Sequence, residues 1–194
     1  PPFRARVARA APRRGRDRST RARAFDRPRG ASRPVGGRGR HGTLPAGRAI
    51  FVIGSRDPIT LAQIDALRAT GAVSYVAAPN GHISGGLEAN AALTLIQATP
   101  GPNETTPQAV ADALGGGLGA ILSRNDATLL LSGGATAGAV MRSLGVSRLH
   151  LHGECLPGLG VASENGRYII AKSGGFGHSD TLKIIAEMVL RKAS

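Results

Sequence analysis

The sequence contains no tryptophan, few phenylalanine and tyrosine residues, and a single cysteine. The lone Cys155 excludes an internal disulfide, and although His150 and His152 share one face of an expected strand, no third residue completes a zinc site. There is no apolar run long enough to cross a bilayer, and the first residues lack the apolar segment of a secretory signal. These absences argue against a disulfide-stabilised secreted domain, a zinc domain and a membrane protein, so we expect a cytoplasmic protein.

Acidic residues are scarce in the first part of the chain. Residues 1–46 contain 14 arginines and two aspartates, whereas residues 47–194 carry a net charge of only +1. The first segment consists mainly of Arg, Ala, Pro and Gly and cannot bury enough apolar surface to offset its ordering entropy. We therefore expect a disordered basic tail over residues 1–46 and a folded domain over residues 47–194.

Two interpretations of the basic tail stay open. Clustered arginines neutralise phosphates and release counterions, which makes the tail a candidate for binding nucleic acid. Arg, Ala, Pro and Gly also have GC-rich codons, so a GC-rich gene translated from a wrong start or in a wrong frame would give the same composition.

Short apolar runs alternate with helical patterns from residue 48 onwards. We expect strands at residues 49–53, 74–78, 93–98, 128–131, 149–151 and 168–171, and helices at residues 60–70, 87–92, 108–122, 136–144 and 180–191. Thr60 is the expected N-cap of the first helix, and Gly115-Gly116-Gly117 is where the third could break. Strands alternating with helices predict an α/β fold, with a mostly parallel sheet flanked by helices.

Glycine-containing turns follow three of these strands. Ser132-Gly133-Gly134 ends a buried strand and leads into a helix, which is a standard way to hold phosphate because the helix start presents free N–H groups. Residues 54–60 and 173–177 form comparable turns, and in open α/β sheets such loops meet beyond the carboxyl ends of the strands. Neither Gly-x-Gly-x-x-Gly nor a Walker sequence is present, so the standard dinucleotide and P-loop sites are not supported.

Four groups of residues occur in one order along the chain. They are Ile53-Gly54-Ser55 with Pro58-Ile59-Thr60 and Gln63-Ile64, then Ser132-Gly133-Gly134-Ala135-Thr136-Ala137, then Gly153-Glu154 with Pro157-Gly158, and finally Lys172-Ser173-Gly174-Gly175-Phe176-Gly177. This series resembles the C-terminal, nucleotide-binding domain of the four-carbon acid sugar kinases, which include 3-oxo-tetronate and threonate kinases. The resemblance spans about residues 48–191.

The resemblance implies an ATP site with Mg²⁺ as the accompanying ion. The residues that it assigns to nucleotide binding are Ser55, Ser132, Gly133, Gly134, Ala135, Thr136, Gly174, Gly175 and Gly177. Ala135 departs from the acidic residue that the family usually has in this turn, and no catalytic or metal-binding residue is assigned. Lys172 is either a counter-charge to phosphate or a solvated lysine before a turn.

The resemblance also implies a separate domain that binds the acid sugar and supplies the general base. Its Asp-rich motif ending in Thr-Gly has no counterpart in residues 1–46. We therefore expect the ATP-binding part of a sugar-acid kinase, inactive by itself. The alternative is a non-catalytic nucleotide- or nucleic-acid-binding protein that uses the basic tail.

Overall fold

A computed structural model describes residues 42, 44–122 and 127–191 of the chain. The chain divides into two units between Gly36 and Gly37, and every described residue belongs to the second unit. The expected tail lies almost entirely outside the described residues, so the division at residue 46 stays a prediction.

The described residues form a mostly parallel mixed sheet with helices. In chain order the elements are β1 (Ala49–Ile53), α1 (Pro58–Arg68), β2 (Ser74–Pro79), β3 (Leu93–Thr99), α2 (Pro107–Leu122), β4 (Thr128–Ser132), α3 (Gly134–Ser143), β5 (His150–Leu156), β6 (Leu159–Glu164), β7 (Arg167–Lys172) and α4 (Thr181–Leu190). The strand order is β2-β3-β1-β4-β7-β6-β5. The first five run parallel, and β6 and β5 continue the sheet antiparallel. The predicted α/β fold class is confirmed.

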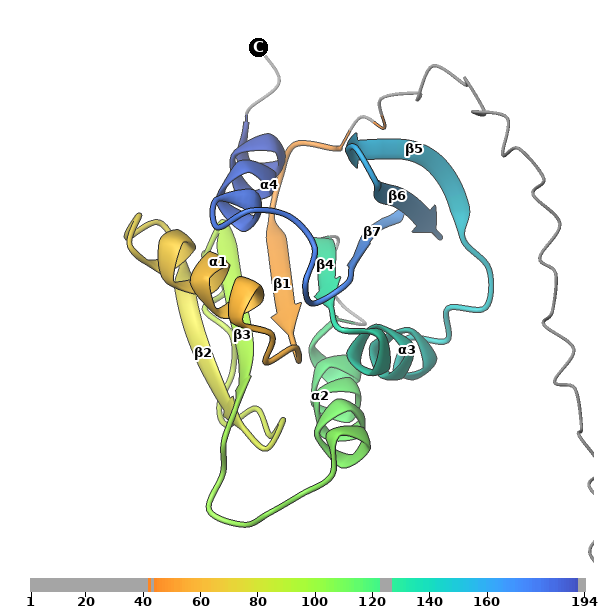
Figure 1. Cartoon of the computed structure of the whole chain (residues 1–194). Helices are drawn as coiled ribbons and strands as arrows, with labels where there is room; N and C mark the ends of the chain where they lie inside the picture. Colours follow the sequence, from red (N-terminus) through yellow and green to blue (C-terminus); the bar gives the residue numbers. More distant parts are fainter. Residues whose placement is uncertain (1–41, 43, 123–126, 192–194) are drawn as a thin grey trace, which may run out of the picture. The chain divides into compact units, whose positions relative to one another are not determined.

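Helices cover both faces of the parallel part of the sheet. Helices α1 and α4 lie on one face, and α2 and α3 lie on the other (Figure 1). Phe51 and Ile53 of β1 pack in the core on the α1 side, while Ile50 and Val52 pack in the core on the α2 side. A strand buried on both faces is apolar at every position, which is why β1 could be predicted from a continuous apolar run.

The helix that follows the central strand β1 lies on one face of the sheet, and the helices that follow its neighbours β3 and β4 lie on the other. The chain leaves β1 for α1, whereas it leaves β3 for α2 and β4 for α3, on the opposite face. Loops that diverge in this way open a crevice at the carboxyl ends of the strands. The fold therefore places its main binding opportunity around the end of β1.

Two helix predictions are corrected by the structure. Helix α1 begins at Pro58, and its N-cap is Asp57, whose Oδ1 accepts a hydrogen bond from the Ile59 N–H at 2.9 Å. The predicted cap, Thr60, is instead buried and donates its hydroxyl to the Gly174 carbonyl oxygen. Helix α2 continues through Gly115-Gly116-Gly117, because close packing against α3 compensates for the low helix propensity of glycine.

The helix expected at residues 87–92 does not form. The segment connects β2 to β3 without a helix, and the Glu88 carbonyl oxygen accepts a hydrogen bond from Arg48 Nη2 at 2.9 Å. Six residues that follow Gly85-Gly86 are too few for a stable helix without strong tertiary packing.

No helix in the described part of the chain is long and apolar enough to cross a membrane.

The antiparallel end of the sheet is larger than predicted. Strand β5 extends beyond residues 149–151, and β6 is a strand that sequence analysis missed. The predicted turn at Gly166 is confirmed, with Asn165 and Gly166 both at positive φ, as a tight two-residue hairpin requires. Strand β5 is irregular: its pairing with β6 shifts register twice, and Leu151 is 70% exposed.

The packing of α2 on α3 leads to a stability prediction. A Cβ atom on Gly115 would lie 2.8 Å from the Ala139 carbonyl oxygen, whereas one on Gly116 would have no neighbour within 4 Å. We expect Gly115→Ala to lower the free energy of unfolding by about 1–3 kcal/mol through overpacking. Gly116→Ala should raise it by about 0.5–1 kcal/mol through helix propensity. Urea denaturation measures both values, and equal shifts would contradict the described packing.

Candidate functional site

A cleft of about 550 Å³ lies at the carboxyl ends of β1, β3 and β4. Its walls come from residues 54–56 after β1, residues 98–105 around the end of β3, and residues 133–136 after β4. Asn80, at the end of β2, and the first turn of α2 complete it. The volume lies within the range of small-molecule and cofactor sites.

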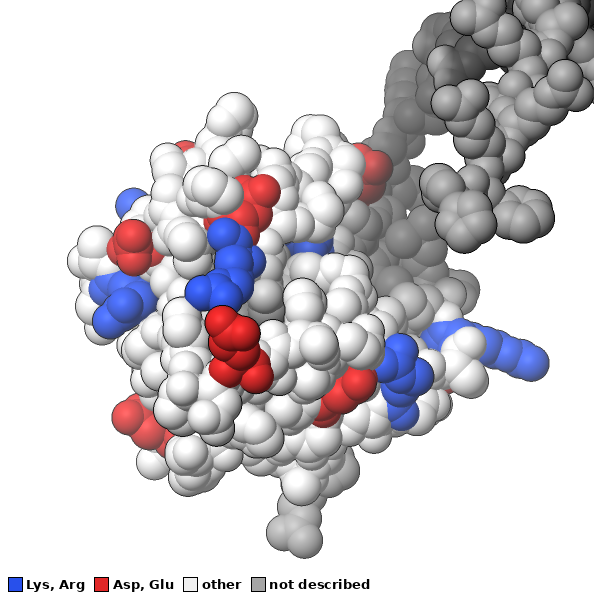
Figure 2. All heavy atoms as spheres, turned by 60° about the horizontal axis from the view of Figure 1, so that its bottom comes forward, with Lys and Arg blue, Asp and Glu red and all other residues white. Residues whose placement is uncertain are grey.

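The cleft is only weakly charged. Figure 2 turns this end of the sheet towards the viewer and shows both acidic and basic side chains, some of them in contact, on a surface that is otherwise uncharged. Among the residues that line the cleft, Arg56 is the basic residue and Glu104 the acidic one. Backbone dipoles therefore have to provide much of any attraction for an anion.

The turn before α3 supplies such dipoles. Gly133 is the N-cap at φ +103°, and in the described part of the chain no side chain caps the helix. The Gly133 N–H donates to the Lys172 carbonyl oxygen at 3.0 Å, which fixes the turn to β7. The first N–H groups of a helix have no intrahelical acceptor, and at this helix they belong to residues that line the cleft. This arrangement suits a phosphate group.

The loop after β1 and the turn after β4 are in direct contact. A Cβ atom on Gly54 would overlap the Thr136 hydroxyl, and one on Gly133 would lie 3.4 Å from the Ser55 backbone nitrogen. The Gly54 N–H also donates to the Ser132 carbonyl oxygen at 3.0 Å. The two predicted turns thus meet, and glycine makes this approach sterically possible.

The turn after β7, residues 173–177, supports the β1–α1 loop and is not among the residues that line the cleft. A Cβ atom on Gly174 would overlap the Ser55 hydroxyl, and one on Gly175 would lie 3.3 Å from Asp57 Oδ2. Gln63 of α1 donates from Nε2 to the carbonyl oxygen of Phe176 in this turn at 2.9 Å and to that of His178, just after the turn, at 2.8 Å. Helix α1 therefore anchors this turn.

The structure brings together part of the predicted nucleotide-binding set. The predicted residues that line the cleft are Ser55, Gly133, Gly134, Ala135 and Thr136. Ser132 is fully buried below the turn, where its hydroxyl has no hydrogen-bond partner among the described residues. Gly174 and Gly175 contact the β1–α1 loop instead, and Gly177 packs against Thr181 at the start of α4.

Sequence analysis missed the wall formed by the β3–α2 loop. Pro100, Pro102, Asn103 and Glu104 line the cleft opposite the glycine turn, together with Asn80. The signal that could have found this wall is positional, because any loop that follows a parallel strand reaches the same edge of the sheet.

Of the two predicted roles of Lys172, the structure contradicts the solvated lysine, and the counter-charge to phosphate stays a prediction. Its side chain is buried, and Nζ donates to the carbonyl oxygens of Ser173 at 3.0 Å and Gly174 at 3.1 Å and to Thr60 Oγ1 at 3.4 Å. Burial lowers the pKa of Lys172 below the ordinary lysine value, and the Asp57 carboxylate acts in the opposite direction. Lys172 therefore ties the turn after β7, residues 173–177, to α1.

Other polar residues singled out by the sequence lie outside the cleft. Glu154 Oε2 accepts a hydrogen bond from the Gly158 N–H at 3.0 Å, so it caps the turn between β5 and β6. The His150 and His152 rings contact each other edge to face, and His152 stacks on Tyr168. Within the described ranges, no three His, Cys, Asp or Glu residues are grouped to hold a metal ion.

Comparisons with known proteins agree with the fold and with nucleotide binding. A family model described as a nucleotide-binding C-terminal domain matches residues 81–182. A domain of unknown function from Bordetella bronchiseptica, crystallised with citrate as a domain-swapped dimer, shares 22% identity at a TM-score of 0.64, covering 79% of this chain and 44% of that chain. A Haemophilus influenzae protein shares 18% identity at a TM-score of 0.61, covering 76% and 42%.

These likenesses to solved structures support the fold. The chain spans less than half the length of either solved chain. No curated protein matches it significantly.

The buried Lys172 predicts a pH dependence of stability. Because its pKa is lowered by folding, the unfolded chain binds this proton more tightly, and stability rises with pH until the ordinary lysine pKa of 10.5 is passed. We expect the free energy of unfolding of the wild type, relative to Lys172→Met, to increase as the pH is raised towards this value. Urea denaturation at a series of pH values measures it.

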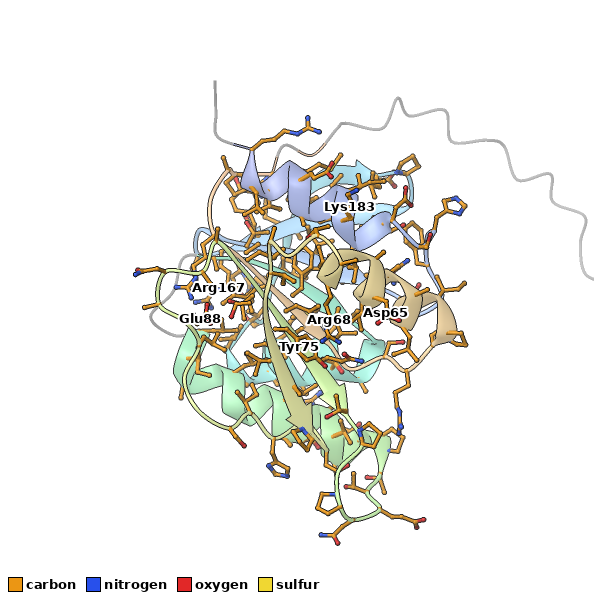
Figure 3. The ribbon with its side chains drawn as sticks, turned by 90° about the vertical axis from the view of Figure 1, so that its left-hand side faces the viewer. Asp65, Arg68, Tyr75, Glu88, Arg167 and Lys183 are labelled. Atoms are coloured by element: carbon orange, nitrogen blue, oxygen red, sulfur yellow. The ribbon has the colours of Figure 1, made fainter. Side chains whose placement is uncertain are left out.

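The matched control for this measurement is Lys183→Met. Lys183 is an exposed lysine of α4 (Figure 3). Lys183→Met should change the free energy of unfolding by an amount that stays constant over the same pH range. A Lys172→Met difference that is equally independent of pH would contradict a folding-linked pKa shift.

Proposed function

This chain belongs to the family of nucleotide-binding C-terminal domains of four-carbon acid sugar kinases, and on that premise we propose that it binds ATP in the cleft at the ends of β1, β3 and β4. The observation that carries the proposal is the uncapped N-terminus of α3, which opens into a cleft of nucleotide size. Membership of a nucleotide-binding family supports this class of ligand, and the glycine turn beside the cleft supports this choice of location.

The glycine turn and Arg56 form the phosphate end of the proposed site. Backbone N–H groups at the start of α3 would donate to phosphate oxygens, and the helix dipole would favour their negative charge. Arg56 lines the same cleft and would add a mobile positive charge. Phosphoryl transfer depends mainly on positioning and charge neutralisation, and these residues are suited to both.

Mg²⁺ is proposed to arrive with the nucleotide. This ion keeps several waters and is commonly held by substrate phosphates and one or two carboxylates, so a dedicated protein cage is not required. Glu104, the carboxylate that lines the cleft, lies in the wall opposite the glycine turn, and Ala135 in the turn offers no ligand, so phosphate oxygens and waters would supply the ligands of the ion. When bound, Mg²⁺ would neutralise charge on the phosphates.

In the proposed reaction, a hydroxyl of a four-carbon acid sugar accepts the terminal phosphoryl group of ATP. Residues of this chain would bind and orient the nucleotide. The resemblance assigns acceptor binding and the general base to a separate domain. This chain spans less than half the length of the solved relatives, and it contains the proposed nucleotide site.

A direct test of the site replaces Gly133 by Ala. Gly133 is at φ +103° in the turn, so a side chain strains the conformation that aims the α3 N–H groups into the cleft. We expect at least about a tenfold loss of ATP affinity, measured by calorimetry with the full chain. The control is Gly145→Ala, which is also at positive φ, has open space around it and lies at the other end of α3. Equal ATP affinity in the two variants would remove the turn from the site.

Activity gives a second test. We expect the 194-residue chain to bind ATP without phosphorylating a four-carbon acid, because holding the acceptor and deprotonating its hydroxyl are separate tasks from nucleotide binding. Release of ADP in the presence of Mg²⁺, ATP and threonate or 3-oxo-tetronate measures it. Acid-dependent release of ADP above the background would show that these residues supply the acceptor site as well.

A further inference from the structure

We propose that the β3–α2 loop, residues 100–106, is the wall that receives the nucleoside part of the bound nucleotide, and that Asn80 is the positioning residue that holds this wall in place. The inference rests on the proposed nucleotide site and adds the element that determines its specificity.

Asn80 uses its backbone and both ends of its side chain to hold the loop. Its N–H donates to the Thr99 carbonyl oxygen at 2.8 Å. Its side-chain Nδ2 donates to the Asn103 carbonyl oxygen at 2.8 Å, and its Oδ1 accepts from the Gly101 N–H at 3.0 Å. One side chain thus bridges the end of β2 to two points of the loop, which shapes a segment that has no regular secondary structure.

The fit between Asn80 and the loop is tight. Asn80 has φ +48°, a left-handed conformation that asparagine adopts more readily than most residues other than glycine. A Cβ atom on Gly101 would overlap the Asn80 amide group. The amide and the loop are therefore packed against each other, and the wall exists before any ligand binds.

The two ends of the cleft suit different parts of a nucleotide. Strands β3 and β4 flank β1 on opposite sides, so the β3 loop faces the glycine turn across two strand spacings, about 10 Å. The glycine turn offers backbone N–H groups for phosphate, whereas the opposite wall offers apolar surface from Pro100, Pro102 and Val110 and an amide from Asn103. A base needs apolar contact with a few polar partners, which this wall provides.

A wall fixed in advance lowers the cost of binding. A loop that had to be ordered by the ligand would consume part of the binding energy, and Asn80 removes that cost. The nucleoside contribution to affinity should therefore depend on Asn80, while the contribution of the phosphates should not.

The experiment compares ATP with inorganic tripolyphosphate, using calorimetry on the full chain. Asn80→Gly removes the amide and keeps the left-handed backbone conformation free of strain. We expect it to weaken ATP binding about tenfold and to leave tripolyphosphate binding within about twofold of wild type. Gly101→Ala, which pushes the amide out of place from the other side, should give the same pattern.

Asn165→Gly is the matched control. Asn165 is also an asparagine in the left-handed region, at φ +50°, but it lies in the exposed β6–β7 turn. It should change binding of neither compound. Urea denaturation of all variants shows whether an affinity change accompanies a loss of folding.

Four other results of these binding measurements would contradict the inference. Equal losses of ATP and tripolyphosphate affinity in Asn80→Gly would overturn the inference, because Asn80 would then support the whole cleft. Unchanged ATP affinity would also overturn it. A wild-type chain that binds tripolyphosphate as tightly as ATP would exclude a nucleoside wall and leave the phosphate site standing. A wild-type chain that binds neither compound would overturn the proposed function and this inference together.

Discussion

The arrangement of this domain depends on the close approach of two loops at the end of its central strand. Gly54 follows β1 and lies against Thr136 in the first turn of α3, at a separation that leaves no room for a side chain. This contact brings the α3 N-terminus to the end of β1, and the second glycine turn then braces the same loop from the α1 side through Ser55 and Lys172. A cleft with the N-terminus of α3 at one end follows from one steric requirement.

The sequence predicted the parts of this site that are encoded locally. Buried parallel strands are continuous apolar runs, so β1 and β4 were recognisable, and the glycines after them marked the turns that meet at the cleft. The hairpin at Gly166 was equally visible, because positive φ at both central positions is a local demand. The helix starts were less accurate, since Asp57 and Thr60 are both good caps and tertiary contacts decided between them.

The remaining features depend on contacts between residues far apart in the chain. Nothing near Lys172 in the sequence shows that its ammonium group will be buried beneath Thr60, more than a hundred residues away. Asn80 likewise looks like an ordinary turn residue until β2 and β3 pair and bring it beside Gly101. Strand β6 was hidden because its first residues, Leu159-Gly160, follow Pro157-Gly158 in a segment with the composition of a loop, and its register comes from its partners.

The irregular strand β5 bears on how this domain behaves among other copies of itself. An edge strand with a regular row of unpaired backbone groups is a template on which another chain can add a strand. In β5 the two register shifts break that row, and the Glu154 carbonyl oxygen already accepts a hydrogen bond from the Gly42 N–H. An incoming strand would find donors and acceptors out of step along its length. The distortion of β5 thus protects the domain from edge-to-edge aggregation, even though Leu151 is largely exposed there.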